Sequence, residues 1–281
     1  MEIAEHVNAL RREGEWLADA AERAGLDAPV PPCAPWQVKD LLRHTGYVHR
    51  WAARHITECP DQIIDGPSEE EILSGGADDA RLLAWFRDGH AALARTLATA
   101  DPAVACATFM PAPSPLAFWA RRQAHETAIH RADADSAAGT MPEYEADFAA
   151  DGIDELIMGF GRRRKYQPGS NADGTRLRVL ATDTGDAWLI EALESRVLPR
   201  RDADGQEEAG CTVSGPASGL YLYLWNRADA ARAGVTVAGD PDCSPPGSPA
   251  SGSAGGDQDR LDLHIICTRS ALLLDPRELP C

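Results

Sequence analysis

The chain has 281 residues, of which 44% are hydrophobic and 25% are charged, and its formal net charge at pH 7 is −17. These values are typical of a globular protein with one large domain or two ordinary ones. The excess of negative charge argues against nucleic acid and anionic membranes as partners, because both attract basic surfaces.

Membrane and secretory signals are missing from the sequence. No apolar run approaches the ~18 residues needed to span a bilayer, and the N-terminal segment carries charge from residue 2 without an apolar signal-peptide core. The seven cysteines are widely scattered and none forms a Cys-x-x-Cys pair. Neither a disulfide framework nor a cysteine zinc site is indicated. We therefore expect a cytoplasmic protein.

The first half of the chain shows the apolar periodicity of amphipathic helices. Acidic residues open the third of these helices, which suits the helix dipole. Residues 57–78 are rich in turn formers and acids and are predicted to form a loop. The predicted helices span residues 2–24, 36–56, 77–100 and 114–136. Four helices of about 20 residues predict an antiparallel four-helix bundle over residues 1–140.

The pattern changes after residue 140. Helices are predicted over residues 146–164 and 216–230, the latter with a proline near its first turn. Short runs of β-forming residues lie at 177–183, 187–192, 196–200, 211–215 and 234–240. Residues 141–240 are therefore predicted to form a small α+β domain, and the fold class of the chain is α+β. Residues 241–281 form an atypical tail, predicted to be disordered, that begins with a low-complexity stretch.

A candidate metal site lies in the fourth helix, in the stretch RRQAHETAIHRADAD (121–135). Glu126 and His130 are four residues apart, so they share one face of a helix and offer two metal donors. A third donor is sought on the second helix, where His44 lies on the apolar stripe of Leu41 and Val48. An inward His opposite an inward Glu–His pair would form a three-ligand site with a position left for water or substrate.

Spacing alone leaves other interpretations open. A lone histidine on an apolar stripe is more often a hydrogen-bonded core residue, and a Glu–His pair beside Arg122 and Arg131 is more often a solvated ionic face. The three candidates could also form a purely structural buried cluster.

Three further histidines, His49, His90 and His125, compete for the role of ligand. His125 points about 100° away from Glu126 on a helix, so both cannot easily face one ion. His49 and His90 remain open as candidates, whereas His6 and His55 lie nearer helix ends and are expected at the surface.

Three segments resemble the mycothiol-dependent maleylpyruvate isomerase family. They are ALRREGEWLADAAERAGLDAPVPPCAPWQVKDLLRHTGYVHRWAA, FWARRQAHETAIHRADAD and TVSGPASGLYLYLWNRADA, in the order that the family shows. The resemblance implies a DinB-like metal-binding helix bundle followed by a small α+β domain. It also implies a divalent metal, typically zinc, held by residues that match His44, Glu126 and His130. A functional arginine of the family matches Arg227. The family's closing helical segment has no counterpart in the tail.

The resemblance further implies a chemistry, in which a metal-bound thiolate of mycothiol adds to an electrophilic substrate. The expected partners are therefore a small-molecule thiol and an electrophile, and the activity is that of an isomerase or a thiol S-transferase. In an isomerase, addition to a cis double bond allows rotation, and elimination gives the trans product. The alternative is a non-catalytic member of the same fold that binds a metal or senses a ligand.

Overall fold

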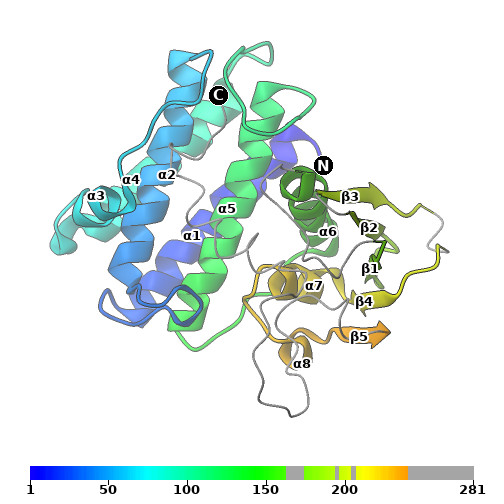
Figure 1. Ribbon diagram of the computed structural model, residues 1–281. Helices are drawn as coiled ribbons and strands as arrows, with labels where there is room; N and C mark the ends of the chain where they lie inside the picture. The colour runs from blue at the N-terminus through cyan, green and yellow to red at the C-terminus, as the bar shows by residue number, and fades with distance from the viewer. Residues whose placement is uncertain (163–173, 194–195, 204–206, 240–281) are drawn as a thin grey trace. The chain divides into compact units, whose positions relative to one another are not determined.

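The computed structural model describes residues 1–162, 174–193, 196–203 and 207–239. These residues fall into two compact units, with the division between Pro142 and Glu143. The predicted disorder of residues 241–281 lies outside the described residues, as does the end of the helix predicted over 146–164. The α+β fold class is confirmed, since a helical first unit is followed by a second unit with a small sheet (Figure 1).

The first unit is a bundle of four long helices, as the periodicity predicted. They are α1 (Ile3–Ala24), α2 (Val38–Glu58), α4 (Asp79–Thr99) and α5 (Pro115–Ala137). In the bundle α1 packs on α4 and α5, and α2 packs on the same two helices. Helices α2 and α5 are therefore neighbours, and side chains on their facing sides meet in the interior. The predicted antiparallel arrangement does not hold for every pair. Helices α1 and α5 run in the same direction, because His6 meets His125 and Glu13 meets Arg131 further along both helices.

Local chemistry fixes where these helices begin. The hydroxyl of Ser114 accepts a hydrogen bond from the backbone N–H of Ala117, and Pro115 occupies the first turn of α5. At the start of α2, Gln37 and Asp40 form a reciprocal capping box. These caps fix the residues at which α2 and α5 begin.

The segment 57–78 is not entirely a loop. It contains the short helix α3 (Glu69–Ser74), whose N-terminus is capped by Ser68 and Glu71. A 3-10 turn, η1 (Pro31–Cys33), precedes α2. Trp36 lies between the turn and the helix, and its side chain is buried. Helix α2 therefore begins two residues later than predicted.

The second unit contains α6 (Ala146–Asp154), which continues through a π-helical turn η2 (Glu155–Gly159) and a 3-10 turn η3 (Phe160–Arg162). Its sheet consists of β1 (Arg176–Ala181), β2 (Ala187–Leu193), β3 (Arg196–Arg201), β4 (Cys211–Gly215) and β5 (Thr236–Gly239). The strand order is β3-β2-β1-β4-β5, with β1 and β4 parallel and the other neighbouring pairs antiparallel.

The core of this unit follows from strand alternation. Leu177 and Val179 of β1 are buried, whereas Arg176 and Arg178, which alternate with them, are partly exposed. The helix predicted over 216–230 is divided into α7 (Ala217–Leu224) and α8 (Ala230–Ala233). Asn226 lies between them in a left-handed conformation, with φ of 57°, which ends α7.

Candidate metal centre

The interior of the helix bundle brings His44, Glu126 and His130 together. One potential ligand atom from each lies within 4.8 Å of the others. The Oε1 atom of Glu126 is 3.6 Å from Nε2 of His44 and 3.2 Å from Nε2 of His130. Ligands that surround a zinc ion tetrahedrally at 2.0–2.2 Å are about 3.4 Å apart. The two distances from Glu126 are therefore close to the separation that one ion requires.

The helices place these side chains as the sequence pattern suggested. His44 lies on the buried stripe of α2 with Leu41 and Val48, and one turn of α5 separates Glu126 from His130. The His44 and His130 rings meet edge to face with centroids 4.9 Å apart. Both rings are buried, and Glu126 is the most accessible of the three, with 13% of its side chain exposed. The pair is therefore not a solvated ionic face.

Burial and charge give the three groups different protonation states. Burial lowers the pKa of His44, which keeps its imidazole neutral at pH 7. Its Nε2 atom is buried and has no hydrogen-bond partner among the described residues. A neutral imidazole with an unused nitrogen facing a carboxylate is suited to ligate a divalent cation.

His130 and Glu126 form a charged pair in the metal-free protein. Burial lowers the pKa of His130, but hydrogen bonds to Asp133 and Glu126 outweigh it and raise this pKa to about 9. Burial likewise raises the pKa of Glu126, but the hydrogen bond with His130 and the nearby imidazole of His44 hold it well below the usual range. Glu126 is therefore a carboxylate at neutral pH.

Three neighbours of the site were given no role in it from the sequence. Arg122 donates from Nη2 to Oε2 of Glu126 at 3.2 Å, which leaves Oε1 toward the imidazoles. Asp133 lies 2.8 Å from Nδ1 of His130, and the Trp36 ring lies 5.0 Å from the His44 ring between centroids. The spacing of Asp133, three residues after His130, is the signal that could have identified it.

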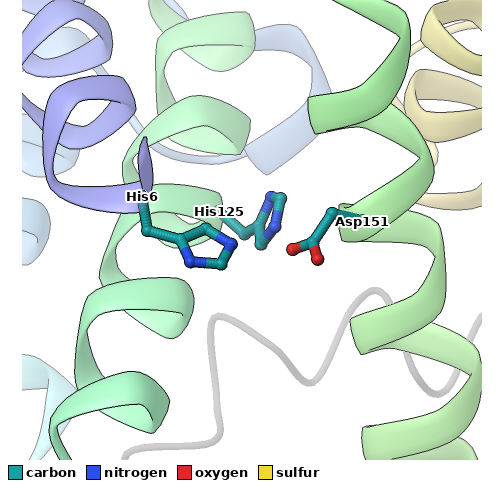
Figure 2. A group of neighbouring side chains, drawn as sticks. All are labelled: His6, His125 and Asp151. Atoms are coloured by element: carbon teal, nitrogen blue, oxygen red, sulfur yellow. The ribbon is translucent and has the colours of Figure 1, made fainter. Parts of the chain in front are cut away.

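The other histidines in the described part of the chain face elsewhere. His125 turns toward α1, where its ring lies against that of His6 with centroids 6.0 Å apart (Figure 2). His49 bonds to the hydroxyl of Thr127, and its ring lies 5.3 Å from that of His90. The divergence expected of His125 and Glu126 is thus seen in their different neighbours.

The expectation that His6 and His55 lie at the surface is wrong, because both are buried. His6 packs on His125 between α1 and α5. His55 bonds through Nδ1 to the carbonyl of Trp51, and its Nε2 accepts a hydrogen bond from the backbone N–H of Ile64. The chain that follows α2 therefore covers the end of the helix and buries His55.

Arg227 follows α7 in the second unit. Its guanidinium donates from Nη1 to the carbonyl oxygen of Trp225 at 2.6 Å. Its backbone N–H donates to the carbonyl oxygen of Leu222, which closes the end of α7. These contacts fix the local conformation of the Leu-Trp-Asn-Arg segment.

The two units define the class of the protein: a DinB-like four-helix bundle joined to a small α+β domain. Family models match both units. The "Mycothiol maleylpyruvate isomerase N-terminal domain" matches residues 7–135, and the "MDMPI C-terminal domain" matches residues 147–244. The chain therefore belongs to the mycothiol-dependent maleylpyruvate isomerase family.

Solved structures share this fold at low sequence identity. A crystal structure of the mycothiol-dependent maleylpyruvate isomerase has 16% identity and a TM-score of 0.55, covering 81% of this chain and 90% of its own. A mutant of that isomerase has 15% identity and a TM-score of 0.59, covering 84% and 93%. No curated protein matches the chain. Within the described residues, no helix has the length and apolar character needed to cross a membrane.

Proposed function

We propose that this protein is a metal-dependent enzyme that uses a low-molecular-weight thiol, mycothiol, in the manner of maleylpyruvate isomerase. The observation that carries the proposal is the convergence of His44, Glu126 and His130 in the bundle of a chain that belongs to this family. The neutral His44, the anionic Glu126 and the nitrogen of His130 form a mixed N/O donor set that suits zinc.

The residues of the site fit a divalent cation on their own chemistry. The unused Nε2 of buried His44 gains a partner when an ion binds, and the Glu126 carboxylate compensates part of the ion's charge. Three protein ligands leave a coordination position open, as in catalytic zinc sites. A bound zinc ion would supply a Lewis acid that favours the thiolate form of a thiol.

The chain's own residues would prepare the site for this chemistry. Arg122 holds one oxygen of Glu126, so the carboxylate presents the other oxygen to the two imidazoles. Buried His44 and Trp36 exclude water from the α2 side. Arg227 stays a prediction as the group that binds a substrate carboxylate through paired hydrogen bonds.

Turnover assays test this proposal. Zinc-loaded protein is incubated with maleylpyruvate, or with a panel of other electrophiles, with and without mycothiol. We expect cis–trans conversion or S-conjugate formation only with mycothiol, and its loss after chelation of the metal. Conversion at the same rate without thiol would contradict the proposal, and zinc binding without any turnover would favour the non-catalytic alternative.

The role of Arg227 has a separate test. Arg227→Lys keeps the positive charge but removes the planar pair of donors, so we expect kcat/KM for a carboxylate substrate to fall roughly tenfold or more. Zinc content measured on the same variant should equal that of the wild type. An unchanged kcat/KM would remove Arg227 from the site.

A further inference from the structure

We propose that Asp133 is a positioning residue for the metal centre, which it serves by holding the imidazole of His130. The inference rests on the proposed metal site and adds a residue that does not itself touch the ion. In this role the Asp133 carboxylate selects the orientation of the His130 ring, and with it the ring nitrogen that faces His44 and Glu126.

The geometry around His130 supports this role. Nδ1 of the ring lies 2.8 Å from Oδ2 of Asp133, and Nε2 lies 3.2 Å from Oε1 of Glu126. A half-turn of the ring would remove both nitrogens from their partners at once. With an ion on Nε2, the single proton of the neutral ring must reside on Nδ1, where it can be donated to Asp133.

The place of Asp133 on α5 supports the same role. It lies three residues after His130, and therefore on the same side of the helix, and its side chain is fully buried. A buried carboxylate is costly unless charged or hydrogen-bonded partners compensate it. The hydrogen bond to His130 provides such compensation and ties the carboxylate to the ligand rather than to solvent.

The same helix supplies a matched control. Asp135 is also a buried carboxylate near the end of α5, but it bonds to Arg23 and Arg131 rather than to a ligand. Asp135→Asn thus removes a buried charge from α5 without touching the His130 contact. Its effect on stability can be compared with that of Asp133→Asn, while only the latter should change metal binding.

The experiment measures zinc affinity by competition with a chromophoric chelator, using the full-length protein. We expect Asp133→Asn and Asp133→Ser to bind zinc about 10–100-fold more weakly than the wild type, and Asp135→Asn to bind it as the wild type does. Asp133 variants that fold with unchanged zinc affinity would overturn the positioning role. A wild-type protein that binds no zinc would overturn the metal site as well, so the two failures are distinguishable.

A measurement on the unmodified sequence covers the case in which neither Asp133 variant folds. In zinc-loaded wild-type protein labelled with ¹⁵N-histidine, long-range ¹H–¹⁵N spectra identify which nitrogen of His130 is protonated. We expect a protonated Nδ1 and a metal-bound Nε2. Zinc on Nδ1, or a His130 that carries its proton on Nε2, would overturn the proposal without any substitution.

Discussion

His130 lies between two carboxylates, so in the metal-free protein it holds a proton that a cation must displace. Its pKa is raised to about 9, which keeps the ring an imidazolium at neutral pH. We therefore expect zinc binding at pH 7.5 to release close to one proton per ion. Calorimetry in buffers of different ionisation enthalpy would measure this number, and no proton release would contradict the assignment of His130 as a ligand.

The same proton predicts how zinc affinity depends on pH. Below the pKa of His130 the ion competes with a proton, so affinity should rise by about tenfold per pH unit up to about pH 9. The stability of the metal-free protein depends on pH in the opposite direction. A pKa raised from 6.5 to about 9 on folding contributes stability that is fully present below pH 6.5 and is lost as the pH rises toward 9.

Several features of these residues could be predicted from the sequence, and others could not. The shared face of Glu126 and His130 follows from helical spacing, and the buried position of His44 follows from its apolar neighbours. The burial of His55 depends on backbone groups of Ile64, nine residues further along the chain, so no local pattern indicated it. Arg122 holds one oxygen of Glu126 from a buried position, and the pattern of charges along the helix does not show that Arg122 is buried.

At the scale of elements, α1 and α5 are held together by a buried ion-pair network. Glu13 of α1 accepts from Arg131 of α5 at 2.8 Å, and Arg131 also bonds to Asp135. The Arg131 guanidinium lies over the ring of Trp16, 4.3 Å from its centroid. The network thus joins the helix that carries two of the proposed ligands to its neighbour.

Removal of Glu13 should weaken this junction. Glu13→Ala removes one carboxylate partner of the partly buried Arg131, so we expect a loss of about 1.5–3 kcal/mol in the free energy of unfolding. Urea denaturation would measure it. Glu15→Ala, at an exposed position two residues further along α1, should change stability by less than about 0.5 kcal/mol. Equal effects of the two substitutions would contradict the proposed importance of the network.

In the second unit, α7 and α8 approach each other at Gly219. A side chain on Gly219 would collide with the backbone carbonyl of Ala233. Because backbone cannot give way cheaply, Gly219→Ala should destabilise this unit by about 1–3 kcal/mol. At Gly161 an added carbon would meet its neighbours at ordinary contact distance, 3.8 Å, so Gly161→Ala serves as the control. Equal denaturation midpoints for the two variants would contradict this account of the packing.

The elements differ in how well their sequences predicted them. The long helices have many turns of consistent periodicity, and their existence and order were confirmed. Helix α3 has six residues, of which only Ile72 is buried, so it carries no periodic signal. The helix predicted over 216–230 is divided into α7 and α8 because Asn226 adopts a left-handed conformation. Asparagine adopts this conformation more readily than most residues, yet it also occurs within helices.

At the scale of the whole molecule, the chain combines two units. The helix bundle brings the three proposed metal ligands together, and the second unit has a hydrophobic core of its own. The α+β class followed from the change of periodicity near residue 140. Membership of the family was predicted from segments in both halves of the chain, and it was confirmed by family models that match both domains. The identity of the electrophile could not be predicted, because it depends on the shape of the site around the open coordination position, and motif spacing does not determine that shape.

The most direct test of the account is the number of zinc ions that the full-length protein holds, measured by elemental analysis after dialysis. We predict that His44→Ala holds one ion fewer per chain than the wild type. His90→Ala, which removes an equally buried ring that lies against His49 and Phe86, should keep the wild-type number. A folded His44→Ala protein with the same zinc content as the wild type would contradict the metal centre proposed here.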